Sequence, residues 1–473
     1  MKSSLSLPAL FLCSGAMLLS ACKTVGPEPV APVLETPSGF VSSDSEAQGN
    51  ETPETRPWWQ DIQDETLTEL ISTALEQNFD IGIAVSNLVQ ARAGVKAFRS
   101  DLSPQFDGFV DSQLQGILAE TGNGDGEGSL SAGGIFNYDP DISGRNRRSL
   151  QAAQARFEAS AFNLSDIRRL TAAAIANQYI ELRRAGARLV LLDTSLDIQS
   201  RTVEIVQARF DAGLTPALDV DRATADLART QAQRGLLNSS RETAGFALSL
   251  LIGEFPGSLD IGIPEDDIIP DFTRNQQVGV PADLLRRRPD VRTAEKTLIA
   301  EIADIGVQEA DLYPSLNLPG RIQIGDTTAG STIAALTASI GAMIDIPLFD
   351  AGRREAEVKI ERAQAEAALL AYRRSLLGAV NDVESALVQI AALNERRTEL
   401  IKAVNSSQSA YEQLDALYSE GLASFIDVLD AQRTLISSRE SLVENDANLA
   451  STKVNLYTAL GDEPADLADS QLN

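Results

Sequence analysis

The chain has 473 residues, of which 43% are hydrophobic, so it is long enough to bury sizeable cores. Its 40 Lys and Arg and 67 Asp and Glu side chains give a formal net charge of −27 at pH 7, which repels nucleic acid and anionic lipid head groups. It contains no histidine, which excludes the commonest general base and the commonest transition-metal ligand.

The N-terminus carries an export signal. Lys2 is followed by the apolar run LPALFLCSGAMLLSAC, which is too short to span a bilayer as a helix. The end of that run, Leu19 to Cys22, is similar to a bacterial lipobox, in which a signal peptidase cuts before the cysteine and the cysteine is acylated. We expect a signal peptide over residues 1–21 and lipidation at Cys22; an ordinary signal peptide with an incidental cysteine is the alternative. Lys23, in place of an aspartate, favours the outer membrane.

Residues 22–64 are predicted to form a lipid-anchored, extended segment. Four prolines between positions 27 and 37 and a polar stretch rich in Ser and Glu disfavour a helix there. Because Cys13 lies in the expected signal peptide, Cys22 is the only cysteine of the mature chain, and no intrachain disulfide is expected. Because Cys22 is expected to be acylated, outer-membrane lipid is an expected partner.

The remainder of the chain is predicted to contain the same unit twice. Glycines, prolines and aspartates recur at a fixed offset, which indicates a tandem duplication. The offset is 208 residues for Gly144 and Gly352, Gly213 and Gly421, and Asp219 and Asp427, and 210 residues for Asp80 and Asp290 and for Pro104 and Pro314. We expect a first repeat over residues 65–262, a connector over 263–281, a second repeat over 282–463 and a tail over 464–473.

Each repeat is predicted to contain two strands. Apolar and polar side chains alternate in four short segments, which is the period of a strand with two different faces. The expected strands lie at about 105–118, 129–139, 315–325 and 338–348. Lengths of about 10 residues suit tilted strands that cross a bilayer.

A very long helix follows each strand pair. The runs from about Arg145 to Phe210 and from about Arg353 to Tyr418 contain no proline and repeat apolar residues at helical spacing. At about 1.5 Å per residue, such a helix is roughly 90 to 100 Å long. This length and the abundant alanines predict coiled-coil packing. A purely structural stalk would show the same pattern and is the alternative.

Each long helix is predicted to fold back in a helical hairpin. Gly213 and Gly421 suit the left-handed residue that ends a helix. Thr215-Pro216 suits a cap followed by a first helical position, and Ser424 stands three residues before Asp427, as in a capping box.

Acidic residues follow each hairpin tip. Asp219 and Asp427 lie in the first helical turn, where the helix dipole alone favours an acid, so a purely structural role is the alternative for both. Asp430 lies too far into the helix for that role and shares a face with Asp427. In an oligomer these two positions would form stacked acidic rings, which favour cations.

Four strands cannot close a barrel, and an open edge is not tolerated in lipid. Two chains would supply eight strands, whose side chains fill the interior, and three chains would supply twelve, with room for a passage. The sequence therefore favours a trimer that is mainly helical with a β-barrel part.

Several motifs carry a family resemblance. PWWQDIQDETLTELISTALEQNFDI around Trp58, LLRRRPDV at 284–291, DAGRREAEV at 350–358 and YSEGLASFIDVLDAQRTL at 418–435 resemble the TolC-like outer-membrane efflux proteins. Among these, the chain is most similar to the lipoprotein branch that serves resistance-nodulation-division (RND) pumps. The resemblance implies a trimeric α/β-barrel duct that works with a periplasmic adaptor and an inner-membrane RND pump, without a cofactor.

The resemblance also implies roles for single residues. Asp427 and Asp430 match acids that ring the periplasmic entrance, and Asp219 and Tyr418 match partners whose contact between neighbouring coiled coils keeps it shut. Ala423 departs from the pattern, because the best-known member has an arginine there.

The tip residues Gly213, Leu214, Gly421 and Leu422 are expected to contact the adaptor. This expectation comes from their position at the two hairpin corners.

Three other functions were weighed against an exit duct for small toxic compounds. A periplasmic adaptor would need a compact β-rich region beside one hairpin, whereas this chain has two hairpins and two strand pairs. A carboxylate-based hydrolase finds no support, because the chain has no Gly-x-Ser-x-Gly elbow or Walker-type loop, and GNGDGEG lacks the spacing of an EF-hand. No catalytic residue and no metal ligand is predicted. A type I secretion duct stays open as an alternative.

Overall fold

The computed structural model describes residues 24–42, 57–62, 64–115, 127–258, 268–272, 281–282, 287–325 and 335–461. Cys22, the tail at 464–473 and most of the connector at 263–281 lie outside the described residues. The chain divides into two compact units. Unit 1 comprises residues 1–34, 86–161 and 293–373, and unit 2 comprises residues 35–85, 162–292 and 374–473.

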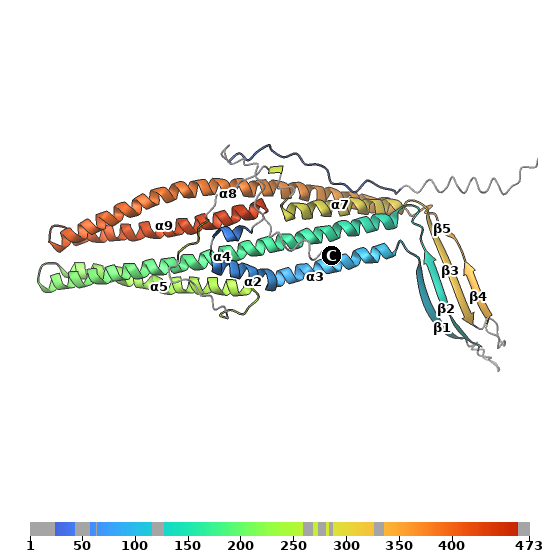
Figure 1. Cartoon of the computed structure of the whole chain (residues 1–473), viewed down its shortest axis with the longest axis horizontal. Helices are drawn as coiled ribbons and strands as arrows, with labels where there is room; N and C mark the ends of the chain where they lie inside the picture. Colours follow the sequence, from blue (N-terminus) through green and yellow to red (C-terminus); the bar gives the residue numbers. More distant parts are fainter. Residues whose placement is uncertain are drawn as a thin grey trace, which may run out of the picture. The chain divides into compact units, whose positions relative to one another are not determined.

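The order of helix, strands, long helix and returning helix occurs twice along the chain, and the colours of Figure 1 follow this order from blue to red. The helices are η3 (Trp58–Ile62), α2 (Glu65–Gln77), α3 (Phe79–Ser100), α4 (Arg145–Asp211), α5 (Ala217–Leu251), α7 (Pro289–Ala310), α8 (Arg353–Ser419) and α9 (Phe425–Leu460). The strands are β1 (Gln105–Gln115), β2 (Glu127–Tyr138), β3 (Ser315–Gly325), β4 (Ala335–Ile340) and β5 (Met343–Asp345). Helices α4 and α8 both have 67 residues, which confirms the two long helices.

Unit 1 holds a sheet in the order β1-β2-β3-β4, in which β5 also pairs with β3. All pairs are antiparallel. Where one strand at about 338–348 was expected, the structure has β4 and β5 with a break between them. The break lies opposite Pro319 of β3, which accepts a hydrogen bond from the Gly341 N–H at 2.8 Å but has no N–H to return. The last three expected residues of the first strand, 116–118, lie outside the described part.

The sheet has two different faces. The pairing register places odd-numbered residues of all strands on one face and even-numbered residues on the other. The even face exposes large apolar side chains: Phe106, Val110, Leu130, Ile322, Ile324, Leu336, Ile340 and Ile344. We call it the apolar face and the odd face the polar face. The alternation confirms the period of two that predicted these strands.

In unit 1, the segment that follows the expected lipidation site is held by a buried arginine. The Arg148 side chain is 1% exposed, and its Nε and Nη2 donate to the carbonyl oxygens of Val25 and Gly26 at 3.0 and 3.1 Å. Gly26 has φ +90° and packs so closely on α7 that a Cβ there would lie 2.5 Å from the Gly306 Cα. Gly306 in turn packs against the Arg148 stem. The N-terminal arm (residues 24–34) is thus fastened to the start of α4.

Replacing Arg148 with Met should release the N-terminal arm. Two charge-assisted hydrogen bonds disappear and the carbonyls must find water, so we expect hydrogen exchange of the arm's backbone amides, such as that of Val25, to become roughly tenfold faster. Arg147→Met is the matched control, because Arg147 pairs with Asp141. Equal exchange rates in the wild type and Arg148→Met would show that the arginine does not hold the arm.

The main core of unit 2 gathers aromatic residues from distant parts of the sequence. Trp58, Phe272 and Tyr457 stack with ring centroids 5.0 to 6.4 Å apart. Asp64 caps α2 by accepting from the Leu67 N–H at 2.9 Å, and it also accepts from the Tyr179 hydroxyl at 2.9 Å. Burial, together with the charge of Asp64, raises the pKa of Tyr179.

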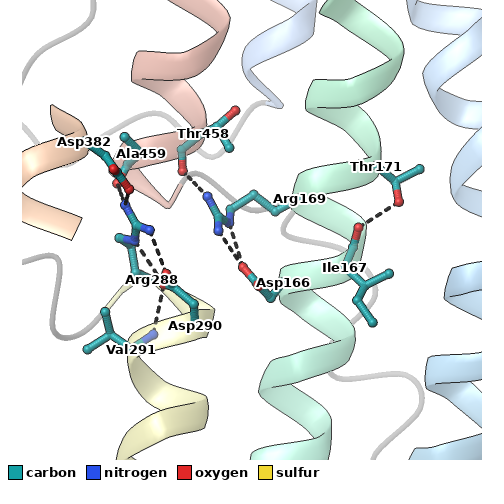
Figure 2. Close-up of polar contacts among 10 residues, drawn as sticks. All are labelled: Asp166, Ile167, Arg169, Thr171, Arg288, Asp290, Val291, Asp382, Thr458 and Ala459. Atoms are coloured by element: carbon teal, nitrogen blue, oxygen red, sulfur yellow. Dashed lines mark hydrogen bonds and ion pairs between the residues drawn. The ribbon is translucent and has the colours of Figure 1, made fainter. Parts of the chain in front are cut away.

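Two arginines bind the last turn of α9 in unit 2 (Figure 2). Arg169 donates to the carbonyl of Thr458, and Arg288 donates to the carbonyl of Ala459 at 3.2 Å. Helix carbonyls at this end lack intrahelical partners and carry partial negative charge, so both contacts are favourable. Arg288 also pairs with Asp290 at 2.6 Å and Asp382 at 3.0 Å. The RRRPD motif therefore ties α7, α8 and α9 together.

Helix α8 is the one described helix that is long and apolar enough to cross a membrane by length and composition. Only 22% of that apolar stretch is buried, and large apolar side chains such as Leu377 and Val388 are exposed. An exposed apolar face of this kind suits packing against another helix as well as lipid. Composition alone does not make α8 a membrane span.

Candidate functional site

The candidate site is the pair of hairpin tips in unit 2, where α4 meets α5 and α8 meets α9 (Figure 1). Gly213 and Gly421 have φ of +72° and +80°, which confirms the left-handed corner residues. The Gly213 N–H donates to the Phe210 carbonyl and the Leu214 N–H to the Arg209 carbonyl, both at 2.8 Å. The second tip repeats both bonds, so each tip is a Schellman motif.

The residue after each tip glycine is exposed. In most Schellman motifs this residue packs back onto the helix. Here Leu214 is 69% exposed and Leu422 is 71% exposed. Two leucines at matching corners therefore present apolar surface to the outside of the chain.

The two helix starts after the tips differ. The expected capping box forms at the start of α9. The Ser424 hydroxyl accepts from the Asp427 N–H, and the Asp427 carboxylate accepts from the Ser424 N–H. At the start of α5, Pro216 itself is the N-cap and no side chain caps the helix. The expected cap by Thr215 is wrong, because its hydroxyl donates to the Asp219 carboxylate at 2.7 Å and does not accept from a backbone N–H of α5.

The structure places Asp427 and Asp430 on the exposed side of α9, one turn apart. Besides the capping contact to Ser424, neither carboxylate has an ion pair among the described residues. Both are free to face an aqueous space. Their alignment on one helix face is the geometry that an acidic ring requires.

Tyr418 lies at the end of α8 and is buried against the other hairpin. The Arg209 guanidinium lies over its ring at 4.7 Å and donates to its carbonyl at 2.9 Å, and the Phe425 ring is 6.0 Å away. Burial raises the pKa of Tyr418. The positive charge of Arg209 lowers this pKa by a smaller amount, and the negative charge of Asp219 raises it further. The Tyr418 hydroxyl finds no hydrogen-bond partner in the described part of the chain. Although Ala423 supplies no charge, Arg209 places a guanidinium at this corner.

A buried ion pair joins the two hairpins above the tips. Asp226 of α5 is 7% exposed and accepts from Nε and Nη2 of Arg433 of α9 at 3.1 and 2.7 Å. The Gln199 amide of α4 also donates to it at 3.3 Å. Next to Arg433, the Gln432 amide is fully buried and lacks a hydrogen-bond partner among the described residues. This polar layer was not predicted; its only signal in the sequence is Asp226, an acid at an apolar-periodic position of α5.

The hairpin tips combine an exposed apolar surface, exposed carboxylates and a packed polar layer. These are features of a surface that binds a partner. In the residues that the structure describes, no group of three or more His, Cys, Asp or Glu side chains is placed to hold a metal ion.

Comparisons with known proteins agree with this geometry. A family model described as "Outer membrane efflux protein" matches residues 70–254 and 280–462, which is more than half of the chain. The pyoverdine export outer membrane protein OpmQ of Pseudomonas aeruginosa is 28% identical over 466 residues, covering 97% of this chain and 97% of that protein.

Two solved structures are similar over nearly their full length. The outer-membrane channel OprN is 29% identical with a TM-score of 0.83, over 92% of this chain and 99% of that one. The MtrE outer membrane channel of Neisseria gonorrhoeae, in a structure described as its open state, is 25% identical with a TM-score of 0.81, over 93% and 99%.

Proposed function

Because the chain belongs to the outer membrane efflux protein family, we propose that it forms the outer-membrane exit duct of a tripartite efflux system. Three copies close a barrel from their sheets and a helical barrel from their hairpins. Small compounds pass through it passively, and the chain itself performs no chemistry. A periplasmic adaptor connects it to an inner-membrane RND pump, and acylated Cys22 anchors it to the outer membrane.

The sheet is the observation that carries this proposal. Its apolar face exposes large side chains, its polar face carries the charged side chains that the structure describes on the strands, and β1 has a neighbour on one side only among the described strands. In lipid every backbone N–H and C=O group must be paired, so this edge must meet a strand of another copy. Purified protein in planar bilayers should form ion-conducting pores, and a preparation that never conducts would reject the duct.

The tip acids are proposed to set the cation preference of the closed end. In a trimer, Asp427 and Asp430 of three chains would form two stacked carboxylate rings. Replacing both with Ala should lower the preference for cations over anions about two- to fivefold, because charges in water interact weakly and are screened by salt. The reversal potential across a salt gradient measures the change. An unaltered reversal potential and conductance would contradict the acidic rings.

The tip leucines are proposed to contact the adaptor. Leu214 and Leu422 expose apolar surface at both corners, and Gly213 and Gly421 fix the turn that presents them. Leu214→Asp combined with Leu422→Asp should reduce cross-linking to the adaptor at least tenfold while trimer yield stays constant, because a buried aspartate costs an apolar interface several kcal/mol. Leu214→Ala with Leu422→Ala is the milder matched variant. Undiminished cross-linking of the Asp variant would place the contact elsewhere.

A further inference from the structure

The charged side chains that the structure describes on the five strands all lie on the polar face. The acids are Asp107, Asp111 and Asp345, and the one base is Arg321. All have odd numbers, and the register places odd residues on the same face. Under the proposed function, this face lines the passage of the barrel. Each chain therefore contributes one cation to the strand-lined part of an otherwise acidic wall.

Arg321 does not pair with the nearest acid. The register aligns Asp107 of β1, Ile135 of β2 and Arg321 of β3 in one row, so the acid and the base are two strands apart, about 10 Å. The guanidinium leans one row along the sheet and lies over the Phe109 ring, 4.3 Å from its centroid. Among the described residues it makes no ion pair.

The sheet is built to allow this contact. Phe109 and Arg321 belong to strands on either side of β2, and the residue of β2 opposite Phe109 is Gly133. Because Gly133 has no side chain, the arginine stem and the aromatic ring meet across β2. A Cβ at this glycine would lie 2.1 Å from the Ile322 carbonyl oxygen, so even alanine does not fit.

We propose that Phe109, Ile135 and Arg321 form a weak subsite on the passage wall for amphipathic anions, of which aromatic carboxylates are the simplest. The guanidinium offers N–H donors in a planar fork that matches a carboxylate, and stacking on Phe109 keeps it preorganised. Phe109 and exposed Ile135 are apolar residues next to Arg321 on the polar face and accept the hydrophobic part of the solute.

The subsite is suited to transit rather than to retention. It lies on an exposed wall, and the surrounding carboxylates repel an anion that moves away from Arg321. Conduction requires sites that bind well enough to admit a solute and weakly enough to release it. A trimer would carry three such subsites at one level of the barrel. This inference deepens the proposed function and depends on it, because the polar face must line a passage.

The test uses full-length protein in a non-ionic detergent and saturation-transfer NMR, with benzoate as the probe and acetate as the comparison. Benzoate should receive saturation from the wild type far more strongly than acetate. Arg321→Gln should weaken the benzoate signal at least about fivefold, since one charge contact is lost. Phe109→Leu should weaken it similarly, and Arg321→Lys should give an intermediate signal, because charge remains without the planar fork.

The matched control is Arg396→Gln, which removes an exposed arginine of α8 outside the sheet. It should leave benzoate binding unchanged. The subsite is rejected if Arg321→Gln binds benzoate like the wild type, or if Arg396→Gln loses as much. Should Arg321→Gln not assemble, Phe109→Leu and Arg321→Lys decide the question by the same criteria.

Failure of this inference and failure of the duct are distinguishable. Wild-type protein that forms trimers and conducts, but binds benzoate independently of Arg321 and Phe109, rejects the subsite alone. Protein that never conducts in planar bilayers rejects the duct, and with it the assignment of the polar face to a passage.

Discussion

Replacing Arg433 with Met is expected to make the hairpin tips open about ten times more readily than in the wild-type chain. Asp226 is 7% exposed and accepts two hydrogen bonds from Arg433, whose side chain is 46% exposed. Without Arg433, the buried carboxylate keeps only the Gln199 amide and the exposed Arg229, 3.7 Å away. Opening lets water reach the carboxylate, so the variant favours the open arrangement. A charged hydrogen bond is worth about 1.5 kcal/mol, or roughly tenfold.

The open fraction in single-channel recordings measures this effect. Arg229→Met is the matched control, because Arg229 lies 3.7 Å from Asp226 on the same helix but is 72% exposed, where an ion pair contributes little. Asp226→Asn in the Arg433→Met background should recover much of the closed state, since a neutral amide tolerates burial better than a carboxylate. If Arg229→Met and Arg433→Met behave alike, the buried pair does not hold the hairpins.

Replacing Arg288 with Met is expected to destabilise unit 2 by about 3 kcal/mol, the size typical of removing one partner from a buried ionic network. The Arg288 side chain is 6% exposed and binds Asp290, Asp382 and the Ala459 carbonyl (Figure 2). Methionine fills the space but satisfies none of these oxygens. Arg287→Met changes the exposed neighbour in the same motif and should have little effect on the melting temperature.

The same variant should alter acid sensitivity. Burial would raise the pKa of Asp290, but the hydrogen bond and charge of Arg288 outweigh burial and lower it. A carboxyl whose folded pKa is below its unfolded value stabilises the fold above the unfolded pKa, near pH 4, and this contribution disappears as the pH falls through the folded pKa. Arg288→Met should lose that dependence. A melting temperature that falls equally in both proteins between pH 5 and pH 3 would contradict the role given to Arg288.

Local patterns predicted most of the fold because the elements here follow local rules. Helical period without proline predicted α4 and α8, and Gly213 and Gly421 predicted the two corners, at which the structure gives both glycines a positive φ. The fourth strand was predicted with the wrong bounds because its break is imposed by Pro319 in a different strand. The alternation of apolar and polar residues within the fourth strand carries no information about the proline in β3, whose missing N–H interrupts the pairing.

The contacts that hold distant segments together were not predictable from local patterns. Arg148 binds residues more than 120 positions away, and Arg433 binds Asp226 across 207 positions. Arginines on long helices are usually solvated, so nothing in their immediate sequence marks these two as partners of distant segments. The proposed gate residues Asp427 and Asp430 were predicted from their shared helix face and from the family resemblance. Their function requires a ring of several chains, so it stays a prediction.

The oligomeric mass of the protein, extracted from outer membranes in mild detergent and corrected for bound detergent, tests the central claim most directly. The duct requires three chains, because only then do the strands close a barrel wide enough for a passage. The account predicts the mass of a trimer. A monomer that stays soluble without detergent once its lipid is removed would contradict it, since the apolar face of the sheet would then never meet a membrane.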